Sequence, residues 1–303
     1  MISFKAGTKV AAICGGEYDG KDVYINKDAD EPDRELEEED IYDLLDDDDF
    51  NMNKYKKLPY RDRIKLERAL KFNTEPIDEY LIPNYRKTSQ KLTEMLKKEF
   101  NLTTGVMIPM PSEKSERVYI AGKAGSGKSC LSAFYAREYN VMFPKNNIFI
   151  FTKHKDEKAY KLIKHKEIHH DNELLQEPIN IELLSDSLVI FDDCDHVQDK
   201  KVEKNLRALN NDLITAGRKY NIHILTLQHQ LMDYKETRNL LNEANKVVFF
   251  NSGSKYHITR YLKVYAGLSP ETIKKINSLK SRWTMISLDI PTYILHEHGI
   301  FII

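Results

Sequence analysis

The chain has 303 residues, of which 41% are hydrophobic and 31% are charged, and this is enough chain for one large domain or two small ones with a substantial core. No apolar run reaches the roughly 18 residues that span a bilayer, and the opening MISFKAGTKV lacks the apolar stretch of a secretory signal. The 3 cysteines, Cys14, Cys130 and Cys194, form no CxxC pair, which excludes a disulfide scaffold and a cysteine-rich zinc site and favours a reducing, cytoplasmic location.

The net charge of −1 hides a strong asymmetry along the chain. Residues 28–49 contain 14 acidic side chains and one basic one, Arg34, whereas residues 51–303 contain 41 Lys and Arg against 30 Asp and Glu. A basic body favours a polyanionic partner such as nucleic acid, although a solubilising excess of charge explains it equally well.

The N-terminal region begins with two segments of different character. Residues 1–27 are expected to contain a β-hairpin over 8–25, because two runs rich in β-branched and aromatic residues flank the turn dipeptide Asp19-Gly20. Residues 28–50 have few large apolar side chains and predict an acidic linker. The alternative is a nucleic-acid mimic that competes for the basic surface.

Residues 51–114 are expected to form a basic helical region. The stretch 54–71 contains eight Lys and Arg against two acids, which suits a helix that contacts phosphates or pairs with the acidic linker. A helix over 84–101 follows from the helical spacing of its apolar residues, Leu92, Met95, Leu96 and Phe100. A Pro-containing loop over 107–117 leads into the remaining domain, residues 115–303.

From residue 115 onward, short apolar runs alternate with amphipathic segments. The runs are ERVYIAG, NNIFIFT, DSLVIFDD, IHILTLQ and KVVFF, and one expected helix spans 200–219. This alternation predicts an α/β fold with a mostly parallel central sheet and helices on both faces. The tail, with RWTMISLDI before Pro291 and YILHEHGIFII after it, predicts two strands that extend the sheet antiparallel.

Residues 122–129, GKAGSGKS, match the phosphate-loop pattern G-x-x-x-x-G-K-[ST] between an apolar strand and a helix-like run. The glycines let successive N–H groups and the helix N-terminus face phosphates. Lys128 would reach the β- and γ-phosphates of ATP, and Ser129 would bind Mg²⁺. The expected nucleotide-binding residues are Gly122, Lys123, Ala124, Gly125, Ser126, Gly127, Lys128, Ser129 and Cys130.

The run LVIFDD ends in two carboxylates, Asp192 and Asp193. Residues at the carboxyl end of a buried strand face the ligand in α/β sheets. Asp192 suits a contact with Mg²⁺ and Asp193 suits orientation of the attacking water, which favours NTP hydrolysis over transfer to a small acceptor. A capped strand end followed by a solvated turn is the simpler alternative.

Two further candidates flank the expected strand 222–228. Gln228 at its end could hydrogen-bond the γ-phosphate or the attacking water, or it could cap a surface loop. Arg218, before the strand, could enter a neighbouring subunit's nucleotide site as an arginine finger. Spacing alone favours the simpler role for Arg218, which is to interact with the helix dipole at a C-terminus.

The other features indicate less specific roles. A basic run made of Lys153, Lys155, Lys158, Lys161, Lys164 and Lys166 either contacts DNA phosphates or forms a solvated helix face, and we expect the second. His169-His170 and His296/His298 lack a carboxylate or thiolate cluster at metal spacing and are expected at the surface. Cys194 has no base partner in sequence and is not expected to act as a nucleophile.

Taken in order, GKAGSGKS, LVIFDD and GRKYNIHILTLQ resemble the FtsK–HerA superfamily of P-loop motor ATPases over residues 115–303. The resemblance is to the poxvirus-type genome-packaging ATPases of large double-stranded DNA viruses. It implies an additional-strand, RecA-like P-loop NTPase fold, with ATP and Mg²⁺ as cofactors. It also implies catalytic roles for Lys128, Asp193, Gln228 and Arg218, although many relatives carry Glu where this chain has Asp193.

The same resemblance implies a ring-shaped homo-oligomer that translocates double-stranded DNA into a preformed capsid, in the host cytoplasm or a viral factory. Capsid proteins or membrane-associated vertex proteins are then the expected partners. One alternative is another translocase or helicase of the superfamily, and a second is a nucleotide-dependent switch or scaffold. A switch would carry a guanine-specifying N/TKxD motif, which residues 152–155 do not complete because they lack the Asp.

Overall fold

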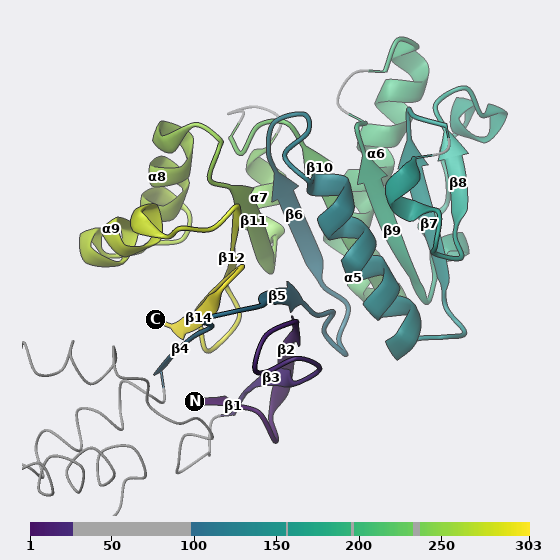
Figure 1. Cartoon of the computed structure of the whole chain (residues 1–303). Helices are drawn as coiled ribbons and strands as arrows, with labels where there is room; N and C mark the ends of the chain where they lie inside the picture. Colours follow the sequence, from purple (N-terminus) through teal and green to yellow (C-terminus); the bar gives the residue numbers. More distant parts are fainter. Residues whose placement is uncertain (27–97, 156, 195–196, 233–236) are drawn as a thin grey trace, which may run out of the picture. The chain divides into compact units, whose positions relative to one another are not determined.

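The computed structural model describes residues 1–26, 98–155, 157–194, 197–232 and 237–303, and these fall into two compact units (Figure 1). The first unit comprises residues 1–9 and 22–100, and the second comprises residues 10–21 and 101–303. In the described part of the first unit, β1 (Ile2–Ser3) pairs antiparallel with β3 (Asp22–Ile25).

Two strands cross from one unit to the other along the chain, β2 (Thr8–Cys14) and β4 (Glu99–Asn101). Within the second unit, β2 pairs antiparallel with β5 (Val106–Pro109), with Ala11 opposite Pro109. Gly20 and Lys21 close the turn after β2 through backbone hydrogen bonds to Ile13. The first and last parts of the hairpin expected over residues 8–25 are therefore strands, β2 and β3.

The second unit is built on one large sheet in the order β14-β13-β12-β11-β6-β10-β9-β7-β8. Six neighbouring strands are parallel: β6 (Arg117–Ala121), β7 (Asn147–Thr152), β8 (Lys166–His169), β9 (Ser187–Asp192), β10 (Ile222–Gln228) and β11 (Lys246–Phe250). The antiparallel extension consists of β12 (Trp283–Ser287), β13 (Tyr293–His296) and β14 (Gly299–Ile302). β10 lies between β6 and β9, so the strand before the phosphate loop and the strand before the paired Asp residues are separated by one added strand.

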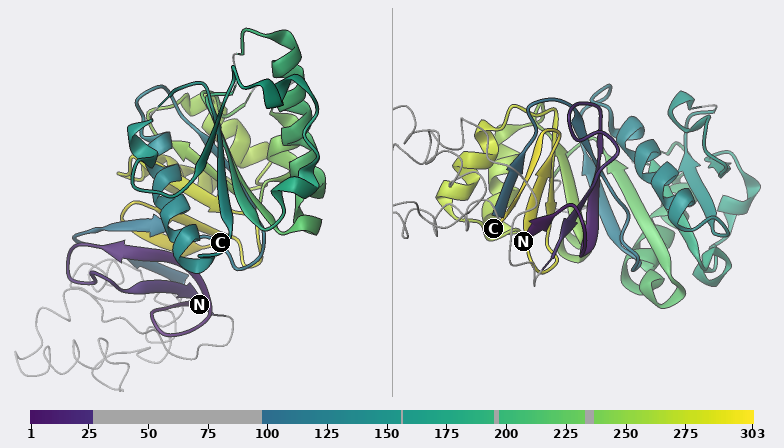
Figure 2. Two further views of the ribbon diagram at one scale, coloured as in Figure 1. Left: turned by 90° about the vertical axis from the view of Figure 1, so that its right-hand side faces the viewer. Right: turned by 60° about the horizontal axis from the view of Figure 1, so that its bottom comes forward.

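Helices cover both faces of this sheet (Figures 1 and 2). α5 (Lys128–Met142) lies on one face, where its Tyr139 ring contacts His223 of β10. The opposite face packs against α6 (Lys200–Ala216), α7 (Arg238–Glu243), α8 (Lys255–Val264) and α9 (Pro270–Ser278). These observations confirm the predicted α/β class, the mostly parallel sheet and the additional-strand P-loop fold. Among the described residues, no helix is both long and apolar enough to span a membrane.

Short 3₁₀ turns complete the second unit, at η1 (Lys158–Tyr160), η2 (Glu173–Gln176), η3 (Ile181–Leu184) and η4 (Gly217–Tyr220). α6 begins where the Asp199 carboxylate accepts hydrogen bonds from the backbone N–H groups of Lys201 and Val202. Leu206, Leu209, Leu213 and Ile214 form its buried apolar stripe, and the expected helix over 200–219 ends as a 3₁₀ turn.

Three local predictions are wrong. The end of the helix expected over 84–101 is β4, because Asn101 and the nearby Thr103, Thr104 and Gly105 are poor helix formers, while residues 84–97 lie outside the described part. The loop expected over 107–117 begins as β5, with Pro109 at the strand end, where a missing N–H is tolerated. The last expected strand is two strands, β13 and β14, joined by a turn at Glu297-His298.

The solvated helix expected from the basic run is also wrong: Lys158 lies in η1, Lys166 lies in the edge strand β8, and the other four lysines lie outside helices and strands. The acidic segment 28–49 and the basic stretch 54–71 lie outside the described residues.

Candidate functional site: a phosphate loop beside paired carboxylates

The phosphate loop leaves β6 and enters α5 with the backbone that its glycines allow. Gly125 and Gly127 have φ angles of +73° and +104°, a region that side chains rarely adopt. A Cβ on Gly122 would lie 2.8 Å from the Phe250 ring, so the first glycine is required by close packing. The sequence pattern therefore identifies real conformational and steric constraints.

The first turn of α5 presents backbone donors rather than competing acceptors. Gly127 at the N-cap provides no side-chain acceptor, and the first turn contains no acidic residue. The turn instead carries the predicted Lys128, Ser129 and Cys130, whose thiol is exposed. A helix N-terminus with this composition favours an anion.

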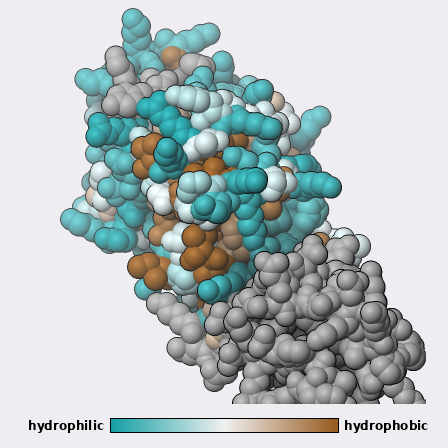
Figure 3. Space-filling model, turned by 90° about the vertical axis from the view of Figure 1, so that its left-hand side faces the viewer, coloured by the Kyte–Doolittle hydropathy of each residue, from teal (hydrophilic) through white to brown (hydrophobic). Residues whose placement is uncertain are grey.

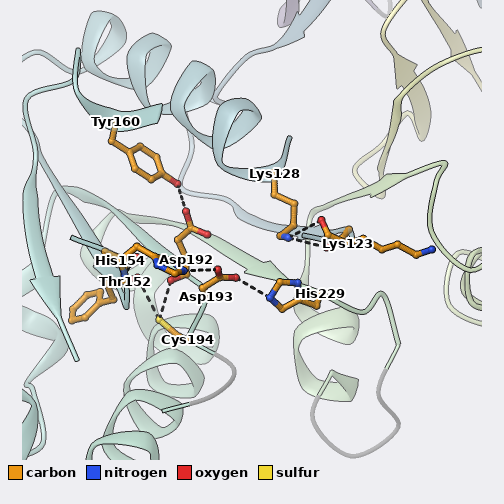
Figure 4. A network of polar contacts seen from close by, with 11 residues as sticks. Lys123, Lys128, Thr152, His154, Tyr160, Asp192, Asp193, Cys194 and His229 are labelled. Atoms are coloured by element: carbon orange, nitrogen blue, oxygen red, sulfur yellow. Dashed lines mark hydrogen bonds and ion pairs between the residues drawn. The ribbon is translucent and has the colours of Figure 1, made fainter. Parts of the chain in front are cut away.

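Lys128 is buried inside the loop, where its Nζ donates to the carbonyl oxygens of Gly122 at 2.8 Å and Lys123 at 3.3 Å. Figure 4 shows the Lys128 ammonium enclosed by the loop while the side chain of Lys123 extends away from it. Lys123 thus contributes through its backbone, and Lys128 supplies the positive charge at the centre of the loop.

Asp192 ends β9 and is only 4% exposed. Tyr160 of η1 donates its hydroxyl proton to Asp192 Oδ2 at 2.9 Å, and the same hydroxyl lies 3.1 Å from Ser132 of α5. Burial raises the pKa of Asp192, while hydrogen bonds from Tyr160 and Ser129 act in the opposite direction. The hydroxyl of Ser129 and this carboxylate are therefore neighbours.

That pair fits the magnesium ion expected beside a phosphate loop. Mg²⁺ takes oxygen ligands and is commonly bound through one or two protein groups together with substrate phosphates and water. A buried carboxylate beside a hydroxyl meets this requirement, and the cation would stabilise the ionised form that burial disfavours. In the part of the chain that the structure describes, no cluster of three or more His, Cys, Asp or Glu residues suits a metal held by protein alone.

Asp193 follows β9 with a φ of +54°, a left-handed backbone that is uncommon for a non-glycine residue. Its two carboxylate oxygens meet two imidazoles: Oδ2 lies 3.2 Å from Nε2 of His154, and Oδ1 lies 3.1 Å from Nε2 of His229. Figure 4 shows Asp193 between these two rings. We call the three residues the His–Asp–His bridge, and its two histidines are absent from the sequence-based set.

Gln228 ends β10 directly beside the loop, and its carbonyl oxygen accepts the Gly122 N–H at 3.0 Å. Its side-chain Oε1 accepts a hydrogen bond from the buried Tyr119 hydroxyl at 2.9 Å. The structure therefore brings Gln228 to the site and holds its amide through the neighbouring strand.

Arg218 lies in η4 at the opposite edge of the sheet, just before β10 begins, and is exposed. Because β10 separates it from Gln228 along its whole length, Arg218 is remote from the phosphate loop of its own chain. Any contact with a nucleotide would have to be made with another subunit.

The weaker sequence features have structural partners. His169 lies 3.3 Å from Glu167, which also contacts His165, and among the described residues this group does not amount to a metal-binding cluster. His296 is buried rather than at the surface, because it lies within β13. The Cys194 thiol donates to the Phe151 carbonyl, which agrees with a structural role.

No protein-family model matches the chain. The protein described as uncharacterized protein V3 of Sputnik virophage is 37% identical over 206 residues, which cover 67% of this chain and 84% of V3. Similar solved structures include the genome packaging NTPase B204 from Sulfolobus turreted icosahedral virus 2 in complex with AMPPCP, with 13% identity, a TM-score of 0.42, and coverage of 60% of this chain and 97% of B204. Another is the cytoplasmic domain of the Thermomonospora curvata type VII secretion ATPase EccC, with 10% identity, a TM-score of 0.45, and coverage of 66% of this chain and 28% of the EccC chain.

The phosphate loop, the paired Asp residues and the added strand between them agree with the FtsK–HerA-type P-loop ATPase that the sequence resembles. The chain belongs to the family of Sputnik virophage protein V3.

Proposed function

We propose that this protein is an ATPase that hydrolyses ATP and uses the energy to translocate double-stranded DNA, packaging a viral genome into a preformed capsid. The observation that carries the hydrolytic part is the His–Asp–His bridge beside the phosphate loop. A second carboxylate, held in a left-handed backbone next to the metal-binding one, suits a group that orients water. Strained backbone of this kind persists where the surrounding structure enforces it and is frequent at functional sites.

The roles follow from the positions of the side chains. Lys128 binds the β- and γ-phosphates, and the N–H groups of the loop and of the first turn of α5 surround them. Ser129 and Asp192 hold Mg²⁺, which when bound neutralises phosphate charge. Asp193 orients the attacking water, and Gln228 senses the γ-phosphate from the neighbouring strand.

Arg218 supplies a guanidinium to the site of the adjacent subunit in a ring. Its exposure and its distance from its own phosphate loop support a role between subunits. A planar guanidinium opposite the transferring phosphate is worth several orders of magnitude in rate in other NTPases.

Two observations support DNA as the partner: the basic charge of residues 51–303 and the similarity to a virophage protein. Residues 51–303 carry 41 basic against 30 acidic side chains, which favours a polyanion, and the relative V3 is a virophage protein. Capsid or vertex proteins complete the proposed set of partners.

The test combines turnover with movement. ATP hydrolysis with Mg²⁺ is measured with and without duplex DNA for the wild type, Lys128→Ala and Asp193→Asn, and ATP binding is measured separately. We expect DNA to stimulate the wild type, Lys128→Ala to be inactive, and Asp193→Asn to bind ATP without hydrolysing it.

Translocation is then followed by ATP-dependent displacement of a third strand from a triplex, which reports movement along a duplex that stays paired. Strand separation without triplex displacement would indicate a helicase instead. ATP turnover that ignores DNA would refute the motor, and near-normal turnover in Lys128→Ala would refute the phosphate-loop site.

A further inference from the structure

The helical pair α8–α9 carries a concentrated positive charge. Residues 253–282 contain seven Lys and Arg against one acidic side chain, Glu271. The exposed cations include Lys255 and Lys263 on α8 and Lys274 on α9. Figure 3 faces the side where α8 and α9 lie, and hydrophilic residues cover much of it around a smaller apolar area.

Three of these lysines surround one point of contact between the helices. Asn277 of α9 donates a hydrogen bond to the Thr259 hydroxyl of α8 at 3.3 Å. Residues three or four apart share a helix face, so Lys255 and Lys263 flank Thr259, and Lys274 flanks Asn277. We call Lys255, Lys263 and Lys274 the lysine ridge.

The ridge differs from three other cations of the same segment, which contact side chains of this chain. Arg282 is paired with Glu297, with its Nε 2.7 Å from Oε1, Arg260 donates to the Tyr256 hydroxyl, and Lys275 lies over the Phe301 ring at 4.2 Å. In the described part of the chain, no carboxylate pairs with a ridge lysine. Unpaired ammonium groups around neutral polar side chains fit the phosphates of a nucleic-acid backbone, which takes most of the hydrogen bonds in protein–DNA complexes.

The segment that leads into α8 packs on the phosphate loop. The Phe250 ring lies against Gly122 and Gly127, and the Gly253 N–H donates to the Phe250 carbonyl at 2.8 Å. A cavity of about 440 Å³ is lined both by the loop residues Ala121, Gly122, Lys123 and Ala124 and by Gly253, Ser254 and His257 at the start of α8. Displacement of the loop would therefore be passed to α8 through direct contacts.

We propose that the lysine ridge is the surface on which duplex DNA is held, and that Phe250 and the start of α8 couple it to the nucleotide. This inference rests on the proposed function and names the DNA-contacting surface of the same motor. We expect the ridge to bind DNA independently of base sequence, because lysines that contact phosphates position a duplex without distinguishing its bases.

The experiment replaces the ridge with Lys255→Gln, Lys263→Gln and Lys274→Gln together, which removes three charges and retains helix-forming residues. The matched control is Lys158→Gln, Lys161→Gln and Lys164→Gln, three exposed lysines in and after η1. Affinity for a mixed-sequence duplex is measured against salt concentration, and turnover is measured with and without that duplex.

For the ridge variant we expect the slope of log affinity against log salt to fall by about 2.7, since each phosphate contact contributes about 0.9. Affinity should fall at least about tenfold, and stimulation by DNA should be lost while basal ATP hydrolysis is unchanged. The control should behave as the wild type. The variant Lys255→Arg with Lys263→Arg and Lys274→Arg should keep both binding and stimulation.

The outcomes separate this inference from the proposed function. A wild type that binds and responds to DNA, combined with an unaffected ridge variant or an affected control, overturns the ridge and leaves the motor standing. A wild type that neither binds duplex DNA nor responds to it overturns both. Loss of basal hydrolysis in the ridge variant, with thermal unfolding unchanged, would also overturn the assignment, since the ridge would then belong to the nucleotide site.

Discussion

The His–Asp–His bridge allows a quantitative prediction about hydrolysis. Asp193 is 28% exposed, and its partners His154 and His229 are 57% and 38% exposed. A hydrogen bond to a charged group contributes about 1.5–3 kcal/mol when buried, and this degree of exposure reduces the value to about 1 kcal/mol for each contact. Removing both contacts should release the carboxylate from its strained position and raise the barrier by about 2 kcal/mol, which is about a 30-fold loss of rate.

The perturbation is therefore His154→Ala with His229→Ala, measured as kcat and KM for ATP with saturating Mg²⁺. We expect kcat to fall about 30-fold and KM to stay nearly constant, because neither histidine is a predicted phosphate ligand. His154→Gln with His229→Gln places an amide N–H near the former Nε2 atoms and should recover most of the rate. His298→Ala, in the turn between β13 and β14, serves as the control. An unchanged or increased kcat in the double alanine variant would refute the idea that the bridge positions Asp193 for hydrolysis.

Two further predictions concern the subunit boundary and the loop. Arg218→Ala should bind ATP nearly normally and hydrolyse it at least about a hundredfold more slowly. Mixing Arg218→Ala subunits with Lys128→Ala subunits should restore part of the ATPase activity. If mixed assemblies form and no activity returns, Arg218 does not act on a neighbouring subunit. Gly122→Ala should lower ATP affinity and thermal stability, because its Cβ would overlap the Phe250 ring at 2.8 Å, an overpacking effect of about 1–3 kcal/mol. Gly125→Ala places its Cβ in open space, so it should be destabilised only by the strain of a left-handed backbone, about 1–2 kcal/mol. Calorimetry in which Gly125→Ala is the less stable of the two variants would contradict this steric account.

The parallel strands and the phosphate loop could be predicted because their signals are local. Each buried strand is a nearly continuous apolar run, and the loop pattern sits between a strand and a helix. The short elements β4, β5 and β8 could not be found this way, since three or four residues do not establish a period. Their pairing partners, which lie elsewhere in the chain, decide that they are strands.

The bridge histidines were missed for a different reason. His154 is 39 residues from Asp193 in sequence, and no local spacing joins them. The signal was available in the order of the strands: residues that follow β7, β9 and β10 must meet at one edge because these strands are parallel neighbours. Asp193 and His229 directly follow their strands and His154 is the second residue after β7, so a predicted topology would have brought them together.

A buried ion pair at the other end of the sheet aligns the strand that leads to the phosphate loop with the strand that leads to α8. Lys246 Nζ lies 2.7 Å from Glu116 Oε2, with side chains 5% and 3% exposed. Lys246 also donates to the Met110 carbonyl, and Glu116 accepts from the Ser112 N–H and the Tyr135 hydroxyl. Both side chains are buried, so removing one charge leaves the other buried and uncompensated.

Lys246→Met should therefore lower the free energy of unfolding by about 3–5 kcal/mol. Adding Glu116→Gln, which keeps an acceptor for the Ser112 N–H, should recover much of the loss, because a neutral amide needs no cation. Burial lowers the pKa of Lys246, but Glu116 together with the nearby Tyr293 and Asp289 outweighs burial and raises that pKa above its ordinary value. A raised pKa in the folded state means that the stabilisation is complete below about pH 10.5 and is lost as pH rises through the folded pKa.

Urea unfolding, followed by the fluorescence of the single tryptophan, Trp283, measures this stability directly, because Trp283 is buried in β12 beside β11. The gap between wild type and Lys246→Met should be constant from pH 7 to 9 and narrow above about 10.5; a gap that narrows toward acid pH, or a double variant no more stable than Lys246→Met, would show that the charge pair does not align these strands.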